Sequence, residues 1–302
     1  MSKGGSTKVV LFALSANLGI AISKFIGAAI TQSSALLAEA IHSLVDTLNQ
    51  VFLLIGSKKA AKPPTARHPL GYGRESFFWS FLVAVGLFLF GGVFAIYEGI
   101  HKFENTEPMS KPWVGVIILL ISFLLEGFSF AACVKEVRKQ NPYPSLWKWI
   151  QRATSVELLV IFLEDFAALL GLLIALVSLS LSWATENPIY DSLGSIVVGV
   201  VLVAVSAILT YEIKSLIIGE AASDDYDSFL KQKVREFFPA GHLLHSIAMQ
   251  VGSDEVMVSF KFFPNLNASS DQLIHQINTM EKSIRAEKPQ VRWLFVEPDF
   301  EK

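Results

Sequence analysis

Apolar residues in this chain are gathered into six long runs, and short polar, glycine-rich or proline-rich stretches separate them. A helix needs about 20 predominantly apolar residues to cross the hydrocarbon core of a bilayer, and the runs have this order of length. They cover residues 9–30, 34–56, 76–100, 113–134, 156–183 and 192–218. The pattern therefore predicts an α-helical membrane domain of six transmembrane helices over residues 1–218.

The pattern changes after Gly219. The apolar stretches shorten to the lengths of ordinary helices and strands, in the order helix, strand, strand, helix, strand. These five predicted elements are residues 224–237, 244–251, 255–263, 269–286 and 291–296. Ser269 or Ser270 is the expected cap of the second helix. The order predicts a small α+β domain of ferredoxin-like type over residues 219–302, marginal as a single core and helped by dimerisation.

Composition supports a membrane protein with an appended soluble part. The chain has 302 residues, of which 52% are hydrophobic and 17% charged, whereas soluble domains average about 25% charged residues. Cys133 is the only cysteine, so a metal site would need nitrogen and oxygen ligands. The polar segment Met1–Lys8 lacks the pattern of a cleavable signal. A net charge of −2 without a basic patch predicts no nucleic-acid partner.

Basic residues are concentrated in two of the loops between the apolar runs. The segments Lys58–Arg74 and Lys135–Arg152 are rich in Lys and Arg, whereas the other loops contain only Lys102 and Lys111. The positive-inside rule places the two basic loops in the cytoplasm. Six spans then place both termini there as well. We expect a multi-pass protein of the cell membrane in a bacterium, or of an organelle membrane in a eukaryote.

The second apolar run carries ionisable residues at helical spacing. Glu39, His42, Asp46 and Asn49 follow one another at intervals of three, four and three residues, so they form one stripe on a helix. A hydrogen-bonded seam between helices would need only Ser, Thr or Asn. Each ionisable group at membrane depth costs at least about 2.5–3.5 kcal/mol on insertion scales, which points to a functional pathway. His42 and Asp46 would supply half of a transition-metal site.

The fifth run adds further carboxylates. Glu157 and Glu164 lie seven residues apart on nearly the same helix face, while Asp165 lies about 100° around the helix. Facing carboxylates repel one another unless they are protonated or hold a cation. Outside these two runs, we expect Lys24 and Glu126 to form a buried structural pair.

Several segments resemble the cation diffusion facilitator family of divalent-metal/proton antiporters. The resemblance extends from about Asn17 to Glu297 and covers nearly the whole chain. It rests on residues 34–46, 68–74, 191–196, Glu220 and 295–298. It implies six transmembrane helices, a cytoplasmic ferredoxin-like domain and a homodimer, in agreement with the pattern above.

The resemblance also implies a ligand set for the transport site, two ligands from the second span and two from the fifth. The matching residues are His42 and Asp46 in the second span and Asp165 in the fifth. The fourth position is Ile161, which cannot bind a metal. Residues 162–171 resemble a distinct branch that includes the mitochondrial members of animals.

The identity of the fourth ligand is therefore open. Glu164 and water are the preferred candidates, and Asn17 and Asn49 are the others. The family's interface site between the second and third spans is degraded as well. His68 is retained there without the expected neighbouring ligands, and we predict no metal site at that position.

These features predict a secondary active transporter that exports a divalent cation from the cytoplasm in exchange for protons. An imidazole with carboxylates suits Zn²⁺ first, and also Mn²⁺, Co²⁺, Fe²⁺ or Cd²⁺. Metal binding requires neutral imidazole and ionised carboxylates and so releases protons, and His42 is the natural coupling group. The alternatives are a passive metal channel and a non-transporting scaffold that dimerises through its C-terminal domain. No permanently bound cofactor is expected, and no motif of a membrane enzyme is present.

Overall fold

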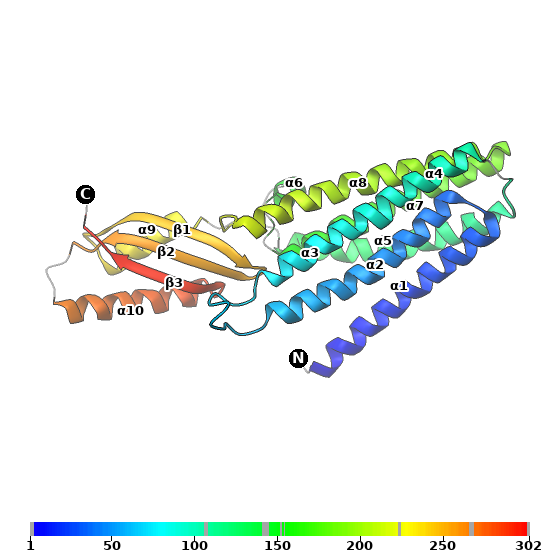
Figure 1. The fold of residues 1–302 in the computed structure, drawn as a ribbon. Coiled ribbons are helices and arrows are strands. Elements are labelled where there is room, and N and C mark those ends of the chain that lie inside the picture. Colours follow the sequence, from blue (N-terminus) through cyan, green and yellow to red (C-terminus); the bar gives the residue numbers. More distant parts are fainter. Residues whose placement is uncertain are drawn as a thin grey trace. The chain divides into compact units, whose positions relative to one another are not determined.

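The computed structural model describes residues 3–105, 108–140, 145–151, 153, 155–222, 225–265 and 269–300 (Figure 1). Arg152, counted above in the second basic loop, and Asp224, the predicted start of a helix, lie outside these residues. The chain divides into two compact units. The first comprises Met1–Gly56, Trp79–Trp149 and Glu157–Ile213, and the second comprises Ser57–Phe78, Ile150–Val156 and Lys214–Lys302.

The first unit consists of long helices, some of which extend into the second unit. They are α1 (Lys3–Thr31), α2 (Ser34–Ala60), α3 (Glu75–Gly86), the π-helical η1 (Leu87–Val93), α4 (Phe94–Glu104), α5 (Pro112–Gln140), the short α6 (Leu146–Ile150), α7 (Val156–Thr185) and α8 (Ile189–Ile218). Among the described residues, four helical stretches are long and apolar enough to cross a membrane. These are Glu75–Glu104, Pro112–Lys139, Val156–Thr185 and Ile189–Ile218. The prediction of a helical membrane domain is therefore confirmed.

Helices α1 and α2 form an antiparallel hairpin around the connection at Gln32 (Figure 1). They are not among the four stretches above. The apolar part of α1 within the described side chains covers only Asn17–Thr31. Helix α2 has 27 residues, but its polar stripe and its last-turn lysines interrupt its apolar character. Composition therefore identifies these two helices less clearly than the other four.

Buried polar contacts fix α8 against α3 and α4. Ser195 Oγ donates a hydrogen bond to the carbonyl oxygen of Ala95 (2.8 Å), and Ser206 Oγ donates to that of Ala84 (2.7 Å). Helices α1, α2, α5 and α7 share a separate apolar cluster. Its buried members are Ala28, Ala35, Leu36, Leu119, Leu172, Ala175 and Leu179. The same four helices surround the candidate site described below.

The second unit contains the C-terminal α+β fold. Its elements are α9 (Tyr226–Phe237), β1 (His242–Gly252), β2 (Glu255–Phe263), α10 (Ser270–Glu287) and β3 (Val291–Pro298). The predicted order of helices and strands is confirmed, and Ser269 is the cap of α10, in a capping box with Gln272. The described strands form one sheet in the order β1-β2-β3, with β1–β2 antiparallel and β2–β3 parallel.

One face of this sheet carries the core. Side chains alternate along β2, so Val256, Val258, Phe260 and Phe262 are buried while the residues between them are only partly covered. Residues of both α9 and α10 pack into this single core. Helix α10 also provides the crossover that the parallel pair β2–β3 requires.

Candidate metal centre

The polar stripe of α2 is buried as a unit. Glu39 and His42 have no exposed surface, Asn49 is 1% exposed, and the side chain of Asp46 is 18% exposed. His42 Nε2 lies 3.6 Å from Asp46 Oδ2. Within the described part of the chain, neither ring nitrogen of His42 has a hydrogen-bond partner, nor does Asp46 Oδ1. Buried polar atoms rarely stay unpaired, so these atoms of His42 and Asp46 are candidates to bind a cation.

A cavity of about 80 Å³ opens beside this stripe. Residues of α1, α2, α5 and α7 line it, namely Asn17, Ile20, Ser43, Asp46, Gln50, Leu125, Glu126, Ser129, Ile161, Glu164 and Asp165. The volume suffices for a cation with a few waters, since one water occupies about 30 Å³ in the liquid. Three of the four predicted ligands therefore border one space. The fourth, His42, is not part of the wall and lies next to it through Asp46.

Neighbouring side chains contact the two carboxylates of α7 that line the cavity. Asn49 Nδ2 donates a hydrogen bond of 2.5 Å to Glu164 Oε1, and Ser129 Oγ lies 3.5 Å from Asp165 Oδ2. Glu164 is therefore tied to α2 in this state. Ile161 is 39% exposed and belongs to the cavity wall, so a side chain at this position can reach the site.

The four predicted ligands do not converge on one point. Among the described residues, no group of three His, Cys, Asp or Glu side chains is placed to hold a metal ion. Binding would therefore require side-chain rotation toward the cavity.

Lys24 has a different partner from the predicted one. Its Nζ lies 3.2 Å from Glu39 Oε2 and donates a 2.6 Å hydrogen bond to Ser43 Oγ, and the pair with Glu39 is fully buried. The predicted pair with Glu126 is wrong. The hairpin of α1 and α2 brings Lys24 level with Glu39, whereas Glu126 lines the cavity.

Gly171 of α7 makes room for the Glu39 carboxylate. A Cβ at position 171 would clash with Glu39 Oε1, the oxygen that does not contact Lys24. This close approach brings α7 against the polar stripe of α2.

Asp191 of α8 caps the N-terminus of α2. Its carboxylate accepts hydrogen bonds from Ser33 Oγ (2.5 Å), Ser34 N (2.6 Å), Ser34 Oγ (2.9 Å) and Ala35 N (3.4 Å). A cap normally comes from the residue just before the helix. This one comes from another helix, so it fixes the height of α2 relative to α8. The sequence indicated residues 191–196 only through the family resemblance, and it gave no sign of this contact.

Four of the five other histidines lie in surroundings that differ from those of His42. His68 is exposed, its ring lies 4.5 Å from that of Tyr72, and its backbone N donates to Thr65 O at 3.0 Å. The ring of His242 lies 5.6 Å from that of Phe263. His245 and His275, the other histidines of the C-terminal domain, are exposed.

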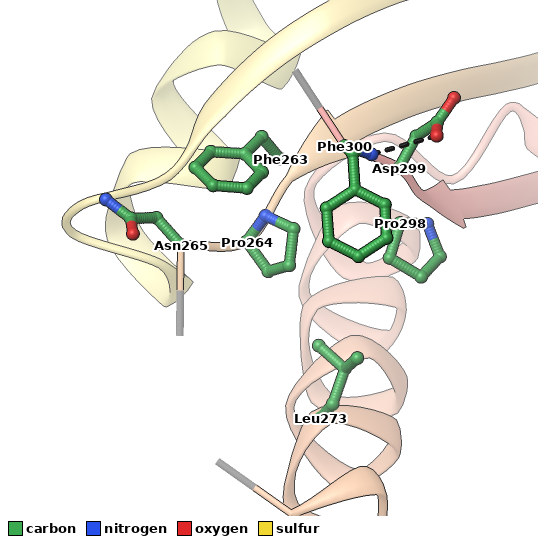
Figure 2. A pocket seen from close by; sticks show the side chains of 7 residues that line it. All are labelled: Phe263, Pro264, Asn265, Leu273, Pro298, Asp299 and Phe300. Carbon is green, nitrogen blue, oxygen red and sulfur yellow. Dashed lines mark hydrogen bonds between the residues drawn. The ribbon is translucent and has the colours of Figure 1, made fainter. Parts of the chain in front are cut away.

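The C-terminal domain has a separate cavity of about 510 Å³. Figure 2 shows Phe263, Pro264, Pro298 and Phe300 around it, while the Asp299 carboxylate accepts a 2.8 Å hydrogen bond from the backbone N of Phe300. Rings and aliphatic groups dominate this wall. It has the character of an apolar recess rather than of a cation site.

Comparison with known proteins identifies related chains. Residues 10–217 match the family described as the cation efflux transmembrane domain. The mitochondrial proton-coupled zinc antiporter SLC30A9 of Xenopus laevis is 32% identical over 255 residues, which are 83% of this chain and 45% of that protein. Metal tolerance protein C4 of Arabidopsis thaliana is 34% identical over 204 residues, 67% of this chain and 45% of that protein. Zinc transporter ZitB of Escherichia coli is 24% identical over 263 residues, 85% of this chain and 77% of that protein.

The chain thus spans less than half the length of the first two of these relatives. The matched family is the one that the motifs of the second and sixth spans resemble. The animal relatives agree with the branch indicated by residues 162–171.

Proposed function

Because the chain belongs to the cation efflux family, we propose that it is a secondary active transporter that exports a divalent metal cation from the cytoplasm in exchange for protons. Zn²⁺ is the first candidate, since the printed names of several relatives describe zinc transport and one describes proton coupling. The observation that carries the proposal is the cavity between α1, α2, α5 and α7, which Asp46, Glu164 and Asp165 line together.

The chemistry of these residues supports coupling of metal to protons. A carboxylate must be ionised and an imidazole neutral before either can bind a metal, so loading the site releases protons. His42, Asp46 and Asp165 are the proposed ligands, with Glu164 or water completing the set in place of Ile161. Imidazole nitrogen and carboxylate oxygen are common Zn²⁺ ligands. Rocking of helices around the cavity would then expose it to one side of the membrane at a time.

The proposal includes a topology. Helices α1 and α2, together with the four apolar helical stretches, would make six spans over residues 1–218, with both termini in the cytoplasm. Residues 219–302 would form a cytoplasmic ferredoxin-like domain reduced to three strands, through which two copies associate. The mitochondrial relatives favour an organelle membrane if the chain is eukaryotic.

Proteoliposome flux tests the function directly. The purified full chain is reconstituted with a pH-sensitive dye inside the vesicles, and Zn²⁺ is added outside, with and without a pH gradient. We expect Zn²⁺ uptake to drive proton release and a pH gradient to drive Zn²⁺ movement. His42→Ala and Asp46→Ala should abolish both fluxes, because each removes a ligand from a site that already lacks one. Glu157→Gln, a matched change of a carboxylate outside the cavity wall of α7, should leave them intact.

Other outcomes identify the alternative functions. Zn²⁺ flux without proton movement would indicate a passive channel. Absence of flux with every metal ion tried would favour a scaffold. Wild-type flux in His42→Ala and Asp46→Ala would remove the proposed site.

A further inference from the structure

The transport proposal gives no role to the long connection between α2 and α3. It covers residues 61–74 and has no helix or strand of its own. Connections longer than about 12–15 residues without secondary structure are uncommon in compact domains and are usually functional. Residues 57–74 contain five Lys or Arg, namely Lys58, Lys59, Lys62, Arg67 and Arg74, and no Asp or Glu.

Hydrogen bonds within this connection hold it in a defined shape. Thr65 N donates to His68 O (3.1 Å), His68 N donates to Thr65 O (3.0 Å), and Gly71 N donates to His68 O (3.0 Å). The Tyr72 hydroxyl lies 3.2 Å from Thr65 Oγ1. A connection ordered in this way loses less entropy when it binds a ligand.

The connection is also anchored to the C-terminal sheet, within the same compact unit. Trp293 Nε1 of β3 donates a 3.2 Å hydrogen bond to Leu70 O. Gly73 packs so closely on the end of β1 that a Cβ there would lie 2.6 Å from Val251 O. The basic side chains therefore project from a fixed backbone rather than from a free tether.

Three of the basic side chains meet at one cavity of about 550 Å³. Lys59, Arg67 and Arg74 line it together with the rings of His68 and Tyr72. Glu75 is the acidic residue in this wall, so the wall carries a net positive charge. The volume lies within the usual range of about 300–1,000 Å³ for small-molecule sites.

We propose that this cavity binds a phosphate group, supplied either by a phospholipid headgroup or by a soluble phosphate. Two guanidinium groups and an ammonium group suit the several oxygens of a phosphate, because Arg pairs with phosphate through two parallel hydrogen bonds. The positive-inside rule explains why basic residues are frequent near the spans. It does not require three of them to face one cavity.

The proposed phosphate site lies next to the ends of two long helices. Lys59 lies in the last turn of α2, the helix that carries His42 and Asp46, and Arg74 directly precedes the apolar stretch that starts at Glu75. A phosphate between them would link the end of one helix to the start of the next. Clusters of Lys and Arg immediately beside a membrane span commonly bind anionic lipid headgroups.

Binding measurements on the full chain in detergent test this site. The probes are phosphatidylglycerol, diacylglycerol as the matched lipid without phosphate, and inorganic phosphate as the soluble source. Arg67→Ala should weaken binding of the phosphate-bearing probe about fivefold, as expected for one basic residue at an anionic headgroup. Arg67→Lys should bind more weakly than wild type and more tightly than Arg67→Ala, because it keeps the charge and loses the second parallel hydrogen bond. Arg138→Ala removes the same charge from the exposed end of α5 and is the matched control.

The outcomes distinguish a lipid source of the phosphate, a soluble source, and the absence of a phosphate site. Phosphatidylglycerol binding that depends on Arg67 but not on Arg138, with no diacylglycerol binding, supports a lipid source. The same dependence for inorganic phosphate alone supports a soluble source. Equal losses at Arg67 and Arg138, or no phosphate-dependent binding at all, would overturn the site. The assay reads no metal flux, so it stands or falls independently of the transport proposal.

Discussion

Individual residues of the helical unit show how charged side chains are accommodated in its interior. Lys24 and Glu39 neutralise each other at 3.2 Å without solvent, while His42 has no hydrogen-bond partner among the described residues. Asp46, Glu164 and Asp165 have a different environment, because all three line one cavity. The first arrangement is that of a structural ion pair, and the second is the one on which the proposed metal site rests.

Lys24→Met should strongly destabilise the protein, because it leaves Glu39 buried without its counter-charge. Breaking a buried pair in this way costs about 3–5 kcal/mol. Thermal unfolding of the purified protein measures the loss. The double variant Lys24→Met with Glu39→Gln should recover much of it, since both charges are then absent. If the single and double variants unfold at the same temperature, charge pairing is not what Lys24 contributes.

Ile161→His should tighten Zn²⁺ binding relative to Mn²⁺. The residue lies in the cavity wall one helical turn before Asp165, so the substitution adds a second imidazole to the carboxylates, and imidazole ligands favour Zn²⁺ over Mn²⁺. Calorimetry with both metals on wild type, Ile161→His and the apolar control Ile161→Leu decides the question. An unchanged Zn²⁺/Mn²⁺ affinity ratio in Ile161→His would show that position 161 does not contribute to the site.

At the scale of elements, contacts with two other helices position α2. Asp191 of α8 holds its N-terminus, and Gly171 of α7 admits the Glu39 carboxylate. The height and the rotation of the helix that carries His42 and Asp46 therefore depend on contacts with α7 and α8. Residues that never touch a metal can set the geometry of the ligands.

Asp191→Ala should lower stability by about 2 kcal/mol, since it removes the acceptor of the hydrogen bonds from Ser33, Ser34 and Ala35. Asp191→Asn retains one acceptor oxygen and should lose less. Thermal unfolding measures both changes. Zn²⁺ affinity should also fall more in Asp191→Ala than in Asp191→Asn, because the cap sets the height of the helix that carries His42 and Asp46. Equal Zn²⁺ affinity in wild type and Asp191→Ala would show that the cap does not set the ligand geometry.

The sequence predicted elements better than the contacts between them. Apolar period and length located the apolar runs and the helix–strand–strand–helix–strand tail, because both depend on local patterning. The pairing of Lys24 with Glu39 and the cap from Asp191 depend on which helices become neighbours, and no local pattern encodes that. The candidate ligands came from helical spacing and family resemblance. In the described structure they do not converge on one point, since convergence depends on side-chain rotamers and helix packing, which spacing alone does not describe.

At the scale of the whole molecule, each of the two compact units is built from three separate segments of the sequence. The segment Ser57–Phe78 contains the connection between α2 and α3 together with the adjoining ends of these helices, and it belongs to the same unit as the C-terminal sheet. Its hydrogen bond from Trp293 to Leu70 joins residues far apart along the chain. Any ligand of this connection is therefore bound by the same unit that contains the C-terminal sheet.

The central claim is that the transported cation binds in the cavity between α1, α2, α5 and α7. Anomalous diffraction at the zinc edge, from crystals of the full chain grown with Zn²⁺, locates the metal most directly. The account predicts a peak in this cavity, about 2.0–2.2 Å from a His42 nitrogen and from oxygens of Asp46 and Asp165. Density at Glu164 or at a water would identify the remaining ligand. A fully occupied zinc peak elsewhere in the helical unit, with this cavity empty, would contradict the account.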